Sequence, residues 1–334
     1  MLEWSKFLIM TKTTFFDFCA GIGAGHTALK DMGHSVGFSE IDPRAETTYR
    51  LVNNAHTLKN WGDLTKITPK ELPDFELMLG GFPCQSFSII GKRQGMKDSR
   101  GLIIFSLAEI LKQKKVKYFL LENVKGLVNH EKGETINKIY ELLTSAGYKV
   151  FWNVLKSSDY GIPQIRERVY FVGVRKDLVG KNFEFKFPKK EKAGRLLKDC
   201  LFNDDKEFIF NEKSAGWKTF ISYLNNKYNK GQFNLNDILK QNGLILDTRQ
   251  SDLRLYKDNC PTLRTGRHGI LYVKDGELRR LSGKEGLMIQ GFEREQAERA
   301  EKISNTLLLA QVGNAFTVRV INRIVKELFK QVQK

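Results

Sequence analysis

The 334-residue chain has little cysteine, no long apolar run and fewer acidic than basic side chains. Its four cysteines, Cys19, Cys84, Cys200 and Cys260, lack CxxC spacing and cluster with no histidine, so neither a zinc site nor a disulfide framework is supported. We therefore expect reduced thiols, no bound metal and a cytoplasmic location. No apolar stretch approaches the roughly 18 residues of a membrane-spanning helix, and residues 1–10 have too short an apolar core for a signal peptide.

The excess of basic residues is the main compositional signal. The chain holds 55 lysines and arginines against 38 aspartates and glutamates, for a formal net charge of +17. This balance indicates a polyanionic partner, either nucleic acid or an anionic membrane surface. A hydrophobic fraction of 41% is that of a globular protein, and the length predicts one large domain with a smaller second unit.

A glycine-rich turn follows the first predicted strand. Residues 14–18 read as a short β run that breaks at the CAGIGAG stretch beginning at Cys19, and a helical pattern follows at residues 26–32. Glycines in such a turn allow close backbone approach, and the helix N-terminus offers free N–H groups. This combination is typical of a nucleotide-binding unit.

Two acidic residues follow at informative places. Glu40 ends the next predicted strand, residues 34–39, and lies nineteen residues after Gly21, where an acid commonly accepts hydrogen bonds from ribose hydroxyls. Asp63, after a third predicted strand near residues 57–61, can accept from an adenine amino group. Together they favour an adenosine-type ligand, and NAD stays open.

Strands and helices alternate through the first half of the chain. This order predicts an α/β fold with a doubly wound, mostly parallel sheet. Further strands are predicted at residues 75–79, 117–121, 150–155 and 168–174, with amphipathic helices at residues 103–112 and 135–146.

A cysteine stands at the end of one of these strands. Residues 79–101 read LGGFPCQSFSIIGKRQGMKDSRG, in which Cys84 follows the apolar strand and a basic, glycine-containing loop follows Cys84. Open α/β sheets place their ligands at the carboxyl ends of parallel strands. The pattern suggests that Cys84 is a nucleophile and that the basic loop covers it when a polyanion binds. The alternative is a small buried cysteine that precedes an ordinary surface loop.

Two later stretches place ionisable groups at strand ends. Glu122 directly follows the apolar run 118–121, where burial should raise the pKa of its carboxyl group; an acid at a helix N-terminus is the alternative. Arg166 and Arg168 alternate at strand spacing with Gln164, which places them on one face and aims two guanidinium groups at one carbonyl oxygen or phosphate. A solvated pair of charges on an edge strand would give the same pattern.

A last amphipathic helix is predicted at residues 318–329. Gly313 and Asn314 precede it. They serve either as helix-capping residues or as one wall of the cofactor site.

Taken together, these stretches resemble the cytosine-5 DNA methyltransferases, particularly the short bacterial modification enzymes. The resemblance covers residues 15–174 and 261–322, in the family's order and spacing. Three positions depart from the family: Cys19 stands where Phe is usual, Ala24 where Gly is frequent, and Ile41 where Trp is frequent. The matching stretches are DFCAGIGAG (17–25), EID (40–42), Asp63, GFPCQSFS (81–88), DSRG (98–101), ENV (122–124), QIRER (164–168) and GN (313–314).

The resemblance implies a covalent mechanism on cytosine. Cys84 would add to carbon 6 of the ring, Glu122 would hold N3 and the exocyclic amine, and Arg168, supported by Arg166, would hold the O2 side. The target base must be flipped out of the duplex. The implied catalytic set is Pro83, Cys84, Glu122, Asn123, Arg166 and Arg168.

The implied cofactor is S-adenosylmethionine, with S-adenosylhomocysteine as product. Glu40 would lie at the ribose, Asp63 at the adenine and Asn314 near the methionine end. The implied cofactor-binding set is Phe18, Cys19, Gly21, Ile22, Gly23, Glu40, Ile41, Asp63, Pro83, Asn314 and Ala315.

The implied substrate is double-stranded DNA, bound by a monomer in a prokaryotic cytoplasm. A catalytic domain is expected at residues 1–180 and 310–334, and a smaller, mostly β target-recognition domain at residues 181–309. Ile90 would wedge the duplex or pack the base of its loop, and Thr262 would touch the DNA backbone. The DNA-binding set is Gln85, Ser88, Ile90, Lys92, Arg100, Arg249, Gln250, Arg254, Thr262, Arg264 and Arg267.

A role beside a cognate restriction endonuclease is also implied by the resemblance. Three other functions stay open: a transfer-RNA methyltransferase of the same fold, a nicotinamide-dependent dehydrogenase and a non-catalytic DNA-binding relative. The Gln after Cys84 and the long recognition segment favour DNA over transfer RNA.

Overall fold

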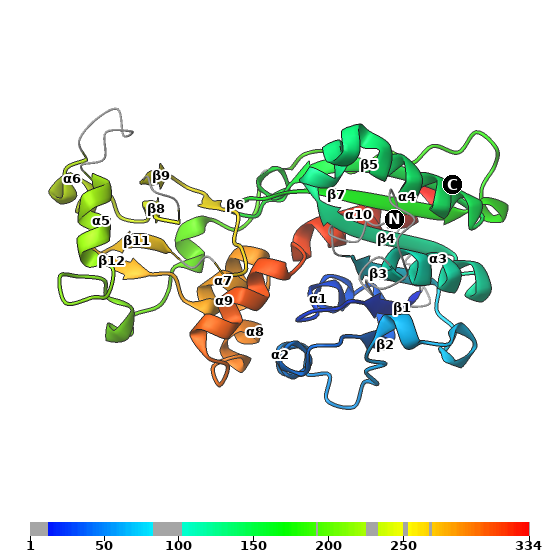
Figure 1. Cartoon of the computed structure of the whole chain (residues 1–334), viewed down its shortest axis with the longest axis horizontal. Coiled ribbons are helices and arrows are strands. Elements are labelled where there is room, and N and C mark those ends of the chain that lie inside the picture. The colour runs from blue at the N-terminus through cyan, green and yellow to red at the C-terminus, as the bar shows by residue number, and fades with distance from the viewer. Residues whose placement is uncertain are drawn as a thin grey trace, which may run out of the picture.

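Six strands form the central sheet of the computed structural model, which describes residues 13–82, 102–191, 193–224, 233–249, 253–266 and 269–333 (Figure 1). Their spatial order is β2-β1-β3-β4-β7-β5, and β7 is antiparallel to both β4 and β5 while the other neighbours are parallel. The predicted doubly wound, mostly parallel sheet is therefore confirmed. The strands are β1 (Thr13–Phe18), β2 (Gly33–Ser39), β3 (Leu77–Gly81), β4 (Tyr118–Val124), β5 (Tyr148–Lys156) and β7 (Glu167–Arg175).

Helices cover both faces of this sheet, so its strands read as nearly continuous apolar runs. Side-chain alternation along β3 sends Leu77 and Leu79 to one face and Met78 to the other. Helices α3 and α4 bury the Met78 face, whereas α1 and α10 bury the opposite one. The helices are α1 (Ala24–Leu29), α2 (Pro43–Asn53), α3 (Leu102–Lys114), α4 (Glu134–Ser145) and α10 (Val318–Val332).

Two strand predictions differ from the structure. The third strand expected near residues 57–61 is a single bridge between Asn60 and Phe38, because the Asn60 side chain bonds the backbone of Glu40 and Gly62 in place of a ladder. The strand expected to end before the two glycines instead runs through Gly81, whose missing side chain leaves room for the ring of Phe316.

A smaller antiparallel sheet lies at the other end of the molecule (Figure 1). Its order is β12-β11-β8-β9, and two helices cover its own apolar core. The expected smaller, mostly β region is therefore present. Its elements are α5 (Trp217–Leu224), α6 (Leu235–Leu239), β8 (Ile245–Asp247), β9 (Arg254–Tyr256), β11 (Ile270–Lys274) and β12 (Glu277–Arg280).

A helical layer and a short strand pair join the two sheets (Figure 1). Strand β6 (Gln164–Ile165) pairs in parallel with β10 (Cys260–Pro261), and helices α7 (Gly283–Gln290), α8 (Arg294–Arg299) and α9 (Asn305–Asn314) share an apolar core with α1 and α10. Short 3₁₀ turns lie at Leu64–Lys66, Pro69–Glu71, Ser157–Tyr160, Lys176–Leu178, Leu197–Cys200 and Lys206–Phe208. The segment Lys125–Gly133 is 3₁₀-helical on both sides of a kink at residues 130–132.

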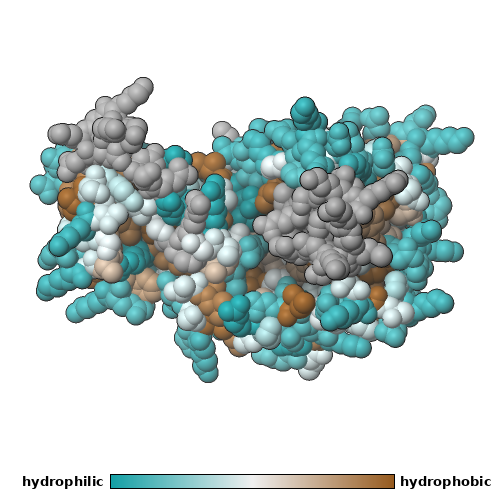
Figure 2. Space-filling model, viewed as in Figure 1, coloured by the Kyte–Doolittle hydropathy of each residue, from teal (hydrophilic) through white to brown (hydrophobic). Residues whose placement is uncertain are grey.

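The face of the molecule in Figure 2 is mostly hydrophilic, with hydrophobic residues in small separate areas. Among the described residues, no helix has the length and apolar character to cross a membrane.

We predict that Gly173→Ala destabilises the fold by about 1–3 kcal/mol, because an added methyl group overpacks the core. A Cβ at Gly173 would lie 1.9 Å from a ring carbon of Phe119. Gly180→Ala is the matched control, since no atom lies within 4 Å of its Cβ position. Urea unfolding measures both, and equal midpoints for the two variants would contradict the assigned packing.

Candidate active site

A pocket of about 400 Å³ lies where β1, β2, β3 and β4 end. Open α/β sheets bind their ligands at these carboxyl ends of the strands. Ten of the residues predicted from the sequence line it, although they come from five separate stretches of the chain. They are Cys19, Gly21, Ile22, Glu40, Glu122, Asn123, Arg166, Arg168, Asn314 and Ala315.

The glycine turn and Glu40 meet directly on one side of this pocket. The Gly21 N–H donates to Glu40 Oε2 at 2.7 Å, and the Asp42 N–H donates to Oε1 at 2.8 Å. Gly21 and Gly23 have φ angles of +55° and +78°, which L side chains rarely adopt. A carboxylate has about four acceptor positions, so Glu40 retains capacity for ligand hydroxyl groups.

Each thiol in the described part of the chain has a raised pKa. Burial, followed by the charges of Glu40, Asp17 and Asp63, raises the pKa of Cys19 to about 12. Burial also raises the pKa of Cys200 to about 12 and that of Cys260 further. Reactive cysteines require a lowered pKa, so Cys84, which lies outside the described residues, is the remaining candidate nucleophile.

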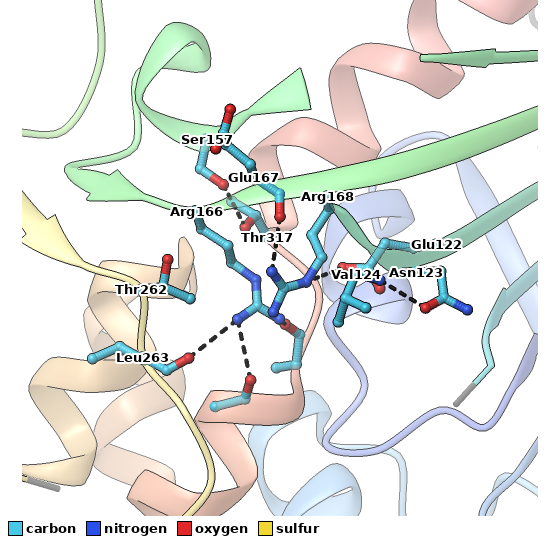
Figure 3. Close-up of polar contacts among 12 residues, drawn as sticks. Glu122, Asn123, Val124, Ser157, Arg166, Glu167, Arg168, Thr262, Leu263 and Thr317 are labelled. Carbon is cyan, nitrogen blue, oxygen red and sulfur yellow. Dashed lines mark hydrogen bonds and ion pairs between the residues drawn. The ribbon is translucent and has the colours of Figure 1, made fainter. Parts of the chain in front are cut away.

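Glu122 and Arg168 form an ion pair on the opposite side of the pocket (Figure 3). Arg168 Nε lies 3.2 Å from Glu122 Oε1, and both side chains are largely buried. Burial raises the pKa of Glu122, against smaller opposing effects of the Arg168 and Arg166 charges. A carboxyl group of this kind can hold a proton closer to neutral pH than an exposed glutamate.

Arg166 does not aim at the same spot as Arg168, and this part of the prediction was wrong. Its side chain is buried, and its guanidinium donates to the carbonyl oxygens of Leu263 (3.3 Å), Gly313 (3.1 Å) and Ala315 (2.9 Å) (Figure 3). The physical reason is long-range: the carbonyl groups that hold its guanidinium belong to residue 263 and to residues 313 and 315, far along the chain.

The two asparagines of the site make hydrogen bonds within the protein, Asn123 to the backbone and Asn314 to a side chain. Asn123 Nδ2 donates to the Phe82 carbonyl at 2.9 Å, and its Oδ1 accepts from the Val124 N–H. Asn314 Oδ1 accepts from the Thr265 hydroxyl at 2.7 Å. Asn123 therefore fixes the backbone of Phe82, the residue before Pro83 in the sequence.

Four other predicted cofactor residues within the described part of the chain do not line the pocket. Phe18 is fully buried in the core, Gly23 forms the turn, and Ile41 is 71% exposed beside Glu40. Asp63 Oδ1 accepts from the N–H and hydroxyl of Thr65. Their contact with a cofactor stays a prediction.

Four predicted DNA-binding residues gather around a smaller pocket of about 120 Å³: Arg249, Arg254, Thr262 and Arg264. The Arg249 guanidinium is engaged within the protein, with two bonds to Asp247 (2.7 and 2.8 Å) and one to the Thr262 carbonyl (2.7 Å). These hydrogen bonds indicate that Arg249 positions the backbone of Thr262. Pro83, Cys84, Gln85, Ser88, Ile90, Lys92, Arg100, Gln250 and Arg267 lie outside the described residues.

Two residues near the pocket were missed from the sequence. Gln290 is buried in α7 and donates to the carbonyls of Val312 (3.1 Å) and Ala315 (2.8 Å); nothing in its local pattern indicated this. The sequence did carry a signal for Asp17, because this acidic residue interrupts the apolar run of β1. It is fully buried, and within the described residues neither carboxyl oxygen has a hydrogen-bond partner.

The fold and this pocket define an α/β methyltransferase architecture. A solved structure of a DNMT2 mutant from Spodoptera frugiperda has a TM-score of 0.69 at 20% identity, covering 95% of this chain and 99% of that one. No group of three or more potential metal ligands occurs in the described part of the chain.

Sequence comparisons define the family. Residues 13–330 match the C-5 cytosine-specific DNA methylases. The type II methyltransferase M.Bsp6I of a Bacillus species is 33% identical over 326 residues, covering 94% of this chain and 97% of that protein. The orphan methyltransferase M.Rho11sI of Bacillus phage rho11s is 38% identical over 237 residues, covering 62% of this chain and about half (47%) of that protein. The chain belongs to the C-5 cytosine-specific DNA methylase family and is an enzyme of that class.

We predict that Asp17 makes stability fall as pH rises. Burial, with a smaller contribution from the Glu40 charge, raises its pKa from 3.8 to about 8. Between these values the folded state keeps a proton that the unfolded state has lost, so the unfolding free energy falls by up to about 1.4 kcal/mol per pH unit. The loss is complete above pH 8.

Asp17→Asn should remove that slope, whatever its effect on absolute stability, because the asparagine side chain does not titrate. Urea unfolding between pH 5 and 8 measures it, and an unchanged slope would rule out Asp17 as its source. Asp31→Asn, at an exposed position, is the control.

Proposed function

We propose that this enzyme transfers a methyl group from S-adenosylmethionine to carbon 5 of a flipped-out cytosine in a specific duplex DNA sequence. The observation that carries the proposal is one pocket holding both the Gly21–Glu40 contact and the Glu122–Arg168 ion pair. The turn that would receive an adenosine ligand therefore adjoins a buried carboxyl group whose pKa is raised by burial.

The lining residues fit S-adenosylmethionine, which supplies the electrophilic methyl group. Glu40 would accept from the ribose hydroxyls, and the Gly21 turn would let the ligand approach the backbone. Asn314 and Ala315 would close the other wall, with Asp63 and Ile41 toward the adenine. The product would be S-adenosylhomocysteine, and no metal is required.

The reacting groups have complementary tasks. Carbon 5 of cytosine becomes nucleophilic once the Cys84 thiolate bonds to carbon 6, because the ring electrons then move toward C5 and N3. Glu122 would donate the proton that N3 takes up and accept a hydrogen bond from the exocyclic amine. Arg168 would hold O2. After methyl transfer, loss of the C5 proton would expel Cys84 and restore the aromatic ring.

The charge of the chain supports a nucleic-acid substrate. A net charge of +17 attracts phosphates, and the pocket around Arg254, Thr262 and Arg264 faces the side on which a target duplex would lie. We also propose that Ile90 contributes to base flipping. The similarity to M.Bsp6I, a type II methyltransferase, supports a restriction-modification role beside a cognate endonuclease.

The experiment that tests this function is methyl transfer from radiolabelled S-adenosylmethionine to duplex DNA and to transfer RNA. We expect transfer to DNA, and Cys84→Ser should abolish it while duplex binding persists, because serine is a much weaker nucleophile at neutral pH. Bisulfite sequencing of DNA from expressing cells then reads the methylated sequence.

Three results would contradict this assignment. Activity on transfer RNA alone would show that the substrate is transfer RNA and not DNA. A fully active Cys84→Ser enzyme would exclude the nucleophile. Failure to trap duplex DNA containing 5-fluorocytosine would support a non-catalytic DNA-binding protein.

We predict that Glu122→Gln lowers kcat by about 10²–10⁴-fold, because the amide cannot supply the proton. Glu76→Gln is a matched control. Glu76 also pairs with a cation, Lys117, but this pair lies at the amino-terminal ends of strands β3 and β4, away from the pocket. Single-turnover methyl transfer measures both variants. Equal rates for the two would remove Glu122 from the mechanism.

A further inference from the structure

A second pocket, of about 440 Å³, adjoins the pocket described above. Four residues line both and form the wall between them: Val124, Arg168, Gly313 and Asn314. We call the second one the target pocket, and residues 262–265 form one of its sides. The charged side chains that line it are Lys125, Glu167, Arg168 and Arg264. Three of them are cations and one is an anion, which favours an anionic ligand.

Two ion pairs lie where β4 and β7 meet the target pocket, one buried and one exposed. The buried pair is Arg168 with Glu122, whose side chains are 14% and 10% exposed. The exposed pair is Lys125 with Glu167, at 2.9 Å, whose side chains are 55% and 43% exposed. The strand register explains this order. Val124 lies opposite Arg168, and Lys125 and Glu167 come one step further along the antiparallel pair.

The buried pair is committed within the protein, whereas the exposed pair is held by a single contact. The Arg168 guanidinium contacts Glu122 through Nε and donates through Nη1 to the Glu167 carbonyl at 2.8 Å (Figure 3). The side chains of Lys125 and Glu167 bond each other, and we find no other partner for them among the described residues. Exposed pairs contribute little to stability, because water and salt screen them. A competing anion can therefore replace Glu167 without a large loss of stability.

A flipped nucleotide brings such an anion. The proposed function places the edge of the flipped cytosine on Glu122 and Arg168. The phosphates on either side of this nucleotide stay with the DNA backbone, so they lie outside the buried pair. Lys125 is the first cation after Glu122 along the chain, and it is exposed. A lysine ammonium binds phosphate as a compact charge with three donors.

We propose that Lys125 binds a backbone phosphate of the flipped nucleotide, and that Glu167 holds Lys125 in the free enzyme until DNA displaces it. The inference rests on the proposed function, because it takes the ligand to be a duplex with a flipped cytosine. It assigns opposite effects to the two members of one ion pair. Loss of Lys125 removes a phosphate contact, whereas loss of the Glu167 charge removes a competitor. A pair that only stabilised the fold would give both variants the same sign.

The test is the Kd of a duplex carrying the sequence that the enzyme methylates, measured by fluorescence anisotropy with S-adenosylhomocysteine present, so that no methyl transfer occurs. Lys125→Met keeps the stem of the side chain and removes its charge. We expect Kd to rise about tenfold or more, as for a lost hydrogen bond between charged groups. The slope of log Kd against log salt should fall by about one, because one phosphate contact is lost. Glu167→Gln should lower Kd by about 1.4- to 5-fold, the contribution of an exposed ion pair.

A neutral methylphosphonate in the DNA tests the partner directly. It replaces the phosphate on one side of the target cytosine and then, in a second duplex, the phosphate on the other side. At one of these two linkages the wild-type enzyme should lose the affinity that Lys125→Met loses on natural DNA, and the variant should lose nothing more. Such non-additivity identifies two groups that act on each other.

Lys117→Met and Glu76→Gln are the matched controls. This ion pair is exposed to a similar extent, but its residues lie just before β3 and β4 begin, away from both pockets. Each control should keep the wild-type Kd and its salt dependence, because no phosphate of the bound duplex reaches that end of the sheet.

The outcomes separate the inference from the function on which it rests. An enzyme that methylates DNA, but whose Lys125→Met variant binds like Lys117→Met, overturns the phosphate contact alone. A full further loss by Lys125→Met on both methylphosphonate duplexes does the same. Changes of equal sign for Lys125→Met and Glu167→Gln overturn the competition. A wild type that neither binds the duplex nor methylates it overturns the proposed function as well.

Discussion

One buried guanidinium group holds together the parts of this enzyme that line its pocket. Arg166 is 2% exposed and donates to three backbone carbonyls from two distant segments of the chain. Burial lowers its pKa to about 10, which still leaves it charged at neutral pH. A buried charge is tolerated when it is well hydrogen-bonded, and each carbonyl left without its donor would cost about 1–3 kcal/mol. The closure of the pocket therefore depends on this residue.

The register of two strands places the reacting groups beside it. Val124 of β4 pairs with Arg168 of β7, so Glu122, two residues earlier on the same face, meets the Arg168 side chain. Arg166 lies just before β7 and turns toward α9 instead. Two arginines separated by a single residue thus have different tasks, one in the ion pair and one in the scaffold.

Much of the site could be predicted from the sequence, because its local signals are strong. The glycine turn and the acid nineteen residues later meet through the Gly21–Glu40 hydrogen bond, and Glu122 follows its apolar strand into a buried position. The direction of Arg166 could not be predicted, since it depends on carbonyls about 100 and 150 residues away. The same holds for Arg249, whose guanidinium is bound by its neighbour Asp247 and by Thr262.

Short-range pattern was sufficient for most strands of the large sheet, the glycine turn and the acidic residues at strand ends, because alternation and turn chemistry act over a few neighbouring residues. It was insufficient near residue 60, where the Asn60 side chain replaces strand pairing with its own hydrogen bonds. Long-range packing alone decided the wall between the two pockets, the partners of Arg166 and Thr265, and the burial of Asp17 without a partner among the described residues. These features arise from contacts between segments that are distant in the chain, so no local pattern encodes them.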